Sequence, residues 1–201
     1  MIRFIALCLS LALAGPIAAQ SQQSLELLRQ ETTHIVPRYL LQDPNGRSVT
    51  SEDFFGRYQL IAFGYTYCPD ICPTTLVEMA AILKLLDDQA EKLQPIFITI
   101  DPERDTGKVL KTYTEFFDPR ILGLTGSPAL VRRTADNFKV RYTKVVEPGA
   151  KPGTYAVDHS AGMILLGPDG QFIKKFPFAM PVDQIAAQIA GLMKTRQALQ
   201  K

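Results

Sequence analysis

Cysteine is scarce in this sequence, and its scarcity excludes a whole class of small exported proteins. Three cysteines occur among 201 residues, at Cys8, Cys68 and Cys72. A domain held together by several disulfides needs more thiols, so a disulfide scaffold is excluded. Histidine is equally rare, with His34 and His159 as its two occurrences. We therefore expect the cysteine pair to serve chemistry, or to form one isolated disulfide.

The sequence also lacks an excess of charge of either sign. Its 22 Lys and Arg residues oppose 20 Asp and Glu residues, for a formal net charge of +2. A nucleic-acid partner is not expected, because binding a polyanion calls for a basic excess. Internal repeats, low-complexity tracts and long linkers are absent after residue 30. The chain is long enough for a single domain with its own core.

Long apolar runs are missing except at the N-terminus. Arg3 precedes an apolar stretch at 4–14, which Gly15 and Pro16 interrupt before the small residues at 17–20. This order is typical of a secretory signal, so we expect residues 1–19 to be a cleaved signal peptide that removes Cys8. A spanning helix needs roughly 20 uninterrupted apolar residues, which favours cleavage over a retained membrane anchor. We expect a flexible lead-in at 20–33, a domain at 34–201 and a periplasmic location, with inner-membrane association as the alternative.

Hydrophobic periodicity predicts an α/β chain. Turn-forming residues at 43–47 predict an early hairpin. Three expected strands then alternate with three helices, which indicates a parallel sheet, and two further strands joined at 167–170 form a hairpin. The order matches a thioredoxin-like fold with an inserted strand–helix segment, an N-terminal extension and a β-hairpin. The expected strands are 59–65, 95–101, 121–125, 154–158, 163–166 and 172–176, and the expected helices are 73–93, 106–117, 127–140 and 182–199.

Cys68 and Cys72 lie four positions apart, at the expected junction of a strand and a helix. If Cys72 begins the helix, both sulfurs can reach one surface near the helix N-terminus. There the free amides and the helix dipole favour thiolate over thiol. Thiolates are soft ligands that select Cu(I) or zinc, while an imidazole suits these ions and Cu(II). With His159 as the third ligand, the set suits copper best.

The number of available ligands argues against structural zinc. Such a site normally has four protein ligands, and this chain offers three obvious ones. Three ligands leave an open face, which a carrier needs in order to hand on its metal. The same thiols can close into a disulfide that removes two ligands at once, so metal binding and thiol oxidation would exclude each other. A permanent disulfide is the alternative, although its very short loop would constrain the unfolded chain little.

Charged residues flank two of the expected strands. Asp101, Arg104 and Asp105 follow a strand end, where we expect a local ion pair that shapes the loop. Asp158 precedes His159, and if both lie on a strand their side chains point to opposite faces. Direct support of the imidazole by this carboxylate is therefore not assured.

Three short motifs together resemble one protein family. They read YCPDICP at 67–73, IDPERDT at 100–106 and VDHS at 157–160. In this order and spacing they resemble the Sco/SenC family of thioredoxin-like copper chaperones, over about residues 40–192. The resemblance implies that Cys68, Cys72 and His159 bind copper, as Cu(I), Cu(II) or both.

The same resemblance implies a recipient. Copper would be delivered to the binuclear copper site in subunit II of cytochrome c oxidase, or the cysteines of that site would be reduced by the redox-active thiols Cys68 and Cys72. Other periplasmic copper carriers or thiol reductants would be further partners. A monomer fits a carrier that must expose its site. Whether the protein is also an enzyme stays open at this point.

Other function classes stay open beside the copper chaperone. A thiol–disulfide oxidoreductase without a metal role would more usually have two residues between its cysteines, and would not require His159. A peroxidase of the peroxiredoxin type would need a threonine three positions before its cysteine, where Tyr65 stands. An interaction domain that merely inherited the fold would leave the thiols inert. Metal affinity of the reduced protein separates the copper chaperone from the thiol–disulfide oxidoreductase.

Overall fold

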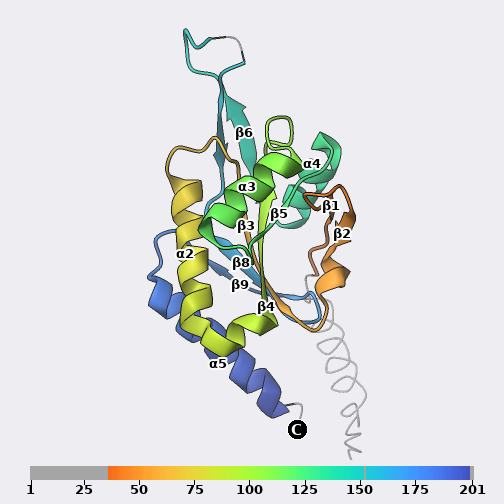
Figure 1. The fold of residues 1–201 in the computed structure, drawn as a ribbon, viewed down its shortest axis with the longest axis vertical. Helices are drawn as coiled ribbons and strands as arrows, with labels where there is room; N and C mark the ends of the chain where they lie inside the picture. Colours follow the sequence, from red (N-terminus) through yellow and green to blue (C-terminus); the bar gives the residue numbers. More distant parts are fainter. Residues whose placement is uncertain (1–35, 152, 200–201) are drawn as a thin grey trace, which may run out of the picture. The chain divides into compact units, whose positions relative to one another are not determined.

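A five-stranded mixed sheet organises the part of the chain that the computed structural model describes, residues 36–151 and 153–199. Its strands follow the order β5-β4-β3-β8-β9 (Figure 1). Strands β3, β4 and β5 run parallel, whereas β8 and β9 are antiparallel to their neighbours. All residues of β3 and β4 are buried, as expected for strands covered on both faces. The five strands are β3 (Tyr58–Gly64), β4 (Leu93–Thr99), β5 (Leu122–Leu124), β8 (Met163–Leu166) and β9 (Phe172–Phe176).

Two crossover helices join the parallel strands, which confirms the alternation predicted from the sequence. Helix α2 (Ile71–Leu86) connects β3 to β4, and α3 (Gly107–Phe117) connects β4 to β5. The helix expected at 73–93 is shorter, because Asp87 adopts a φ of 48° and ends α2. A 3-10 helix, η2 (Asp87–Lys92), covers the remainder.

Hydroxyl caps set the starts of the next two helices. The side chain of Thr106 accepts the amide hydrogen of Val109 and caps α3. Ser127 does the same for Leu130 at the start of α4 (Pro128–Asn137). Both helices therefore begin one residue later than the sequence predicted, because the capping residue itself is not helical.

Aromatic contacts show what covers each face of the sheet. The ring of Phe97 on β4 lies 5.8 Å from that of Tyr113 on α3. The ring of Phe63 on β3 lies 5.5 Å from that of Phe138, which directly follows α4. Because Ala62 is the register partner of Phe97, Phe63 and Phe97 point to opposite faces. Helix α3 thus covers one face, and the end of α4 covers the other.

The remaining elements are the terminal helix and two hairpins outside the main sheet. The predicted turn at 43–47 joins β1 (Leu40–Gln42) to β2 (Ser48–Thr50), and a short 3-10 helix, η1 (Ser51–Phe54), follows. Helix α5 (Val182–Leu199) has its predicted bounds and packs beside α2.

A second hairpin, the arm, was not predicted. It pairs β6 (Tyr142–Val145) antiparallel with β7 (Ala156–His159) and rises above the sheet (Figure 1). The strand expected at 154–158 belongs to this arm. The sequence pattern around β6 is a poor signal, because three of its four residues are exposed.

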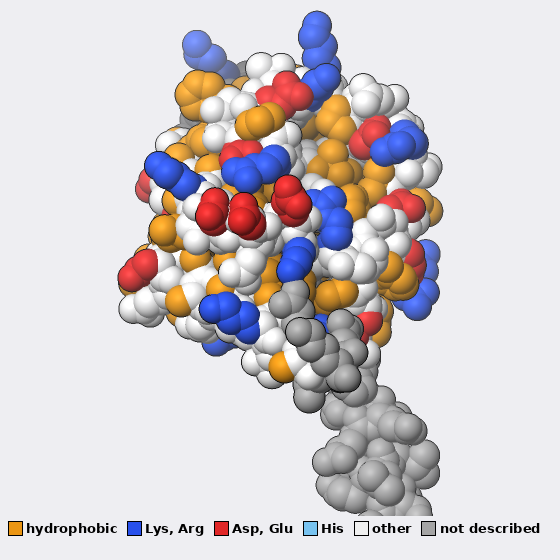
Figure 2. Space-filling model, turned by 60° about the horizontal axis from the view of Figure 1, so that its bottom comes forward, with side chains coloured by type: hydrophobic (Ala, Val, Ile, Leu, Met, Phe, Trp, Pro, Cys, Tyr) orange, Lys and Arg blue, Asp and Glu red, His pale blue; other side chains and the backbone are white. Residues whose placement is uncertain are grey.

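The surface agrees with the balanced charge of the sequence. Figure 2 shows basic and acidic side chains interspersed over one face, with hydrophobic side chains between them. No helix within residues 36–151 and 153–199 is long and apolar enough to cross a membrane. The signal peptide and lead-in predicted at 1–33, and His34, lie outside the described residues.

Candidate metal centre

The fold brings the three candidate ligands together from distant parts of the sequence. Cys68 lies in the loop after β3, Cys72 in the first turn of α2, and His159 at the end of β7. The sulfur of Cys72 lies 3.6 Å from Nε2 of His159, 87 positions along the chain. The amide of Cys72 donates to the sulfur of Cys68 at 3.4 Å. Both thiols are free.

The two cysteines differ in burial, and this changes their expected chemistry. Cys72 is 2% exposed, whereas Cys68 is half-buried. Burial raises the pKa of the Cys72 thiol. A helix dipole is worth about 0.3–1 kcal/mol, and desolvation of a buried thiol acts in the opposite direction, against the charged form. For Cys72, burial therefore opposes the thiolate that the helix N-terminus was predicted to favour.

The imidazole of His159 is oriented by its own backbone neighbour. Its Nδ1 lies 3.1 Å from the carbonyl oxygen of Ser160, which can only accept, so Nδ1 carries the hydrogen. Nε2 then directs its lone pair toward Cys72. Burial lowers the pKa of His159 and keeps the ring neutral, the form that binds metals. Asp158 is exposed while its neighbours turn inward, which confirms the predicted opposite facing of Asp158 and His159.

A glycine beneath Cys72 makes room for its thiol. A Cβ on Gly64, the last residue of β3, would lie 2.7 Å from the sulfur of Cys72 and 2.8 Å from the ring of Phe97. No side chain fits there without displacing one of the two. The sequence reading missed this role, although a glycine at the end of an apolar strand is itself a signal of close approach.

Tyr65 connects the strand that leads to the cysteines with the strand that carries the histidine. Its buried hydroxyl accepts the amide hydrogen of Val157 on β7 at 3.2 Å. Its ring meets that of His159 edge-on, with centroids 6.2 Å apart. This role was also missed, because only the folded chain places Tyr65 against β7.

Asp105 fixes the loop that leads to Cys68. Its carboxylate accepts the amide hydrogen of Thr66 at 3.0 Å and the Thr66 hydroxyl at 2.6 Å. The hydroxyl of Thr99 donates to it as well, at 2.7 Å. Asp105 is fully buried, and burial raises its pKa. The loop is thus anchored two residues before Cys68.

Asp101 and Arg104 form the local ion pair that the sequence predicted, through Nε of Arg104. The pair also reaches across to the arm. The hydroxyl of Tyr155, next to β7, donates to Asp101 at 2.7 Å. No pattern in the sequence pointed to this long-range partner.

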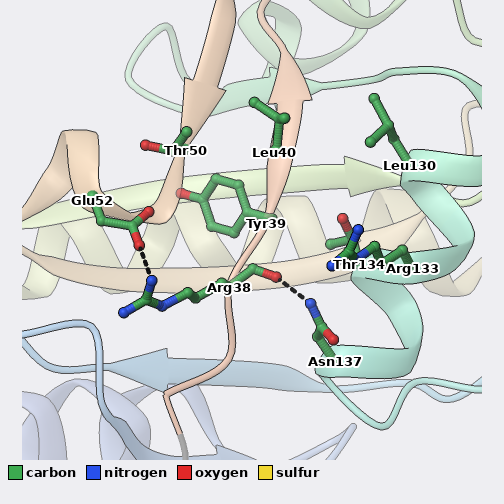
Figure 3. Close-up of a pocket in the computed structure, with 9 residues that line it drawn as sticks. All are labelled: Arg38, Tyr39, Leu40, Thr50, Glu52, Leu130, Arg133, Thr134 and Asn137. Carbon is green, nitrogen blue, oxygen red and sulfur yellow. Dashed lines mark hydrogen bonds and ion pairs between the residues drawn. The ribbon is translucent and has the colours of Figure 1, made fainter.

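A separate hollow of about 300 Å³ lies between the β1–β2 hairpin and α4 (Figure 3). An ion pair of 3.3 Å joins Arg38 to Glu52 there, and Asn137 donates to the carbonyl of Arg38. Its lining contains no cysteine or histidine, so it adds no soft ligand to the candidate site. It is lined by Arg38, Tyr39, Leu40, Thr50, Glu52, Leu130, Arg133, Thr134 and Asn137.

Sequence comparison gives a coherent family match. The model of the SCO1/SenC family matches residues 28–194. The mitochondrial SCO2 homologue of Danio rerio is 39% identical over 175 residues, covering 86% of this chain and 62% of the relative. The SCO2-like protein of Rickettsia felis is 42% identical over 136 residues, covering 68% and 66%. This chain therefore spans less than two thirds of the length of either relative.

Solved structures of similar proteins point to the same family. ScoI of Arabidopsis thaliana, determined with copper bound, is 33% identical with a TM-score of 0.74, covering 80% of this chain and 99% of that one. ScoI of Bradyrhizobium japonicum, also with copper bound, is 39% identical with a TM-score of 0.70, covering 77% and 96%. BsSco, a member of the Sco family of cytochrome c oxidase assembly proteins in which a disulfide switch was identified, is 28% identical with a TM-score of 0.60, covering 79% and 92%. The predicted thioredoxin-like α/β fold is confirmed.

Proposed function

Because the chain belongs to the SCO1/SenC family, we propose that it binds copper through Cys68, Cys72 and His159 and delivers it to the binuclear copper site in subunit II of cytochrome c oxidase. The observation that carries the proposal is the 3.6 Å approach of His159 Nε2 to the Cys72 sulfur. A thiol oxidoreductase without a metal would not require that contact. Two similar proteins were solved with copper bound, and a third belongs to a family of cytochrome c oxidase assembly proteins.

We place this activity in the periplasm, with residues 1–19 as the signal peptide and the protein acting as a monomer. Its partners would be subunit II and other periplasmic copper carriers or thiol reductants. The near-neutral charge supports a protein partner over a nucleic acid.

The residues suit a soft metal cargo that is taken up and released. Within the described residues, no three Cys, His, Asp or Glu side chains are grouped closely enough to hold an ion as they stand. Cys68 is less buried than Cys72. Its side chain therefore has more freedom than that of Cys72 to move toward a metal. Both thiols give up their protons on binding, and His159 accepts none because its Nε2 lone pair is the donor. Three ligands leave a face open to the recipient.

Copper stoichiometry tests the ligand set. We expect the fully reduced protein to retain an equimolar amount of copper after anaerobic Cu(I) loading and desalting. Cys68→Ala, Cys72→Ala and His159→Ala should each lose it or bind it far more weakly. His34→Ala is the matched control, since it removes the other histidine of the chain. Retention that is indifferent to His159 would contradict the proposed ligand set.

Thiol–disulfide exchange is the second candidate function, and the difference in burial between the cysteines favours it. Cys68 is accessible to a partner disulfide, while Cys72 is buried with its amide against the Cys68 sulfur. Attack by the Cys68 thiolate on a partner disulfide would form a mixed disulfide and release one partner thiolate. Attack by Cys72 on Cys68 would then release the second. Reduction of an oxidised subunit II domain by protein that binds no copper would make this the main function.

A further inference from the structure

One arginine side chain lies among three tyrosines beside the candidate metal centre. The guanidinium carbon of Arg104 lies 3.7 Å from the ring centroid of Tyr155, 4.7 Å from that of Tyr67 and 5.7 Å from that of Tyr65. The Arg104 side chain is 19% exposed. Guanidinium groups at these distances are attracted to aromatic faces, and more strongly when water is excluded.

Directional bonds fix the same guanidinium. Its Nε donates to the carboxylate of Asp101, and its Nη1 donates to the backbone carbonyl of Tyr155 at 3.1 Å. Asp101 in turn accepts the Tyr155 hydroxyl. Tyr155 is therefore held to the Asp101–Arg104 pair by its ring, its hydroxyl and its backbone, while Nζ of Lys144 on β6 lies 4.6 Å from the centroid of the same ring. Nη2 of Arg104 is buried and has no hydrogen-bond partner among the described residues, so the tyrosine rings are its main compensation.

The two flanking tyrosines belong to the two halves of the site. Tyr67 directly precedes Cys68, and Tyr155 directly precedes β7, which ends at His159. The guanidinium thus contacts the cysteine loop, which is the segment 65–70 between β3 and α2, and also the residue that directly precedes β7. Asp105, the next residue in the chain, anchors the cysteine loop through Thr66.

We propose that Arg104 is a positioning residue that clamps the cysteine loop to β7 through Tyr67 and Tyr155 and thereby keeps His159 within reach of the two thiols. This inference rests on the proposed function for its copper consequence. The clamp itself is a property of the metal-free protein.

Loss of the clamp should affect the two oxidation states of copper unequally. Cu(I) favours soft thiolates, here Cys68 in the loop before α2 and Cys72 in its first turn. Cu(II) favours nitrogen ligands and a tetragonal geometry, so it depends more on the imidazole. Residues that only orient a ligand typically change metal affinity by about 10–100-fold when replaced. We expect that range for Cu(II) and a smaller loss for Cu(I), because Cu(I) also uses the imidazole but draws more of its affinity from the two thiolates.

The test compares Arg104→Met, Arg104→Lys and Tyr67→Leu with Arg196→Met. Arg196→Met is the matched control, because it removes an Arg–Asp pair, with Asp169, that joins α5 to the β8–β9 turn. Cu(I) and Cu(II) affinities come from competition with chelators, and the thiolate-to-Cu(II) absorption band reports the ligand geometry. Arg104→Met and Tyr67→Leu should weaken Cu(II) binding and shift the band, Arg104→Lys should rescue at most part of both, and the control should resemble wild type.

Parallel losses of Cu(I) and Cu(II) affinity, or unchanged Cu(II) affinity, would overturn the proposal. Tyr67 is 64% exposed, so Tyr67→Leu keeps the test available if Arg104→Met fails to fold.

Hydrogen exchange of the reduced, metal-free proteins separates this inference from the proposed function. Amides of β7 should exchange faster in Arg104→Met and in Tyr67→Leu than in wild type, while those of β8 and β9 stay unchanged. Unchanged exchange in β7 would refute the clamp whether or not the protein binds copper. Faster exchange in β7, together with a wild-type protein that binds neither Cu(I) nor Cu(II), would leave the clamp standing and reject the proposed function.

Discussion

At the scale of single residues, Cys72 is the most deeply buried of the three candidate ligands. It has Gly64 beneath it, His159 beside it and the Cys68 sulfur against its amide. The sequence predicted Cys68, Cys72 and His159 as candidate ligands from residue type and spacing. It could not predict that Cys72 is buried, because burial depends on what the rest of the chain places over it.

Replacing Gly64 with alanine should destabilise the reduced, metal-free protein by about 1–3 kcal/mol, since the added methyl group overpacks a filled space. Its Cβ would lie 2.7 Å from the sulfur of Cys72. Urea unfolding measures the change. Gly191→Ala in α5 is the control, because a Cβ there would meet no atom within 4 Å and should be neutral or stabilising by up to about 1 kcal/mol. Equal effects of the two substitutions would rule out the close approach at Gly64.

The imidazole should make stability depend on pH. Burial lowers the pKa of His159, so the folded protein keeps the ring neutral while the unfolded chain protonates it below about pH 6.5. The unfolded state then binds more protons, and the free energy of unfolding falls as the pH drops below this value. At higher pH the ring is neutral in both states, so it adds no pH dependence to the free energy of unfolding.

Urea unfolding at pH 7.5 and pH 5.5 measures this contribution. We expect the loss of stability between these values to be smaller in His159→Gln than in wild type. An identical loss in both proteins would mean that His159 titrates as it does in the unfolded chain.

At the scale of elements, the arm formed by β6 and β7 decides where His159 lies. The sequence predicted the regular elements with strong periodicity well, and β8, β9 and α5 have the bounds expected. It missed β6, because this strand is short, mostly exposed and without apolar alternation. The arm is joined to the rest of the molecule by side chains from distant segments, which include Tyr65 and Arg104.

Tyr65→Phe should loosen the arm. The substitution removes the hydroxyl that accepts the buried amide hydrogen of Val157, and an unsatisfied buried donor costs about 1–3 kcal/mol. Hydrogen exchange should accelerate in β6 and β7. Tyr113→Phe is the control, because its buried hydroxyl has no hydrogen-bond partner among the described residues. It should leave the arm unchanged, and faster exchange in both variants would point to a general loss of packing instead.

At the scale of the whole molecule, metal binding under the proposed function should raise global stability. A ligand at about 100 times its dissociation constant stabilises the folded state by about 2.7 kcal/mol. For a domain of this size each kcal/mol raises Tm by about 2–4 °C. Anaerobic Cu(I) should therefore raise the Tm of the reduced protein by about 5–10 °C.

Protein with a Cys68–Cys72 disulfide is the control for that experiment, and copper should not shift its Tm, because two ligands are lost together. An equal shift in both forms would place the copper elsewhere on the molecule.

Local patterns in the sequence were enough to determine the α/β class, most of the element order, the three candidate ligands and the family. Such features depend on residue type and spacing over short stretches, from hydrophobic periodicity to the four-residue separation of Cys68 and Cys72. The tertiary structure alone decided the distance between Cys72 and His159, the burial that raises the pKa of the Cys72 thiol, and the contacts of Arg104 with Tyr67 and Tyr155. Each of these depends on groups that are far apart in the chain, and desolvation and packing act on neighbours in space.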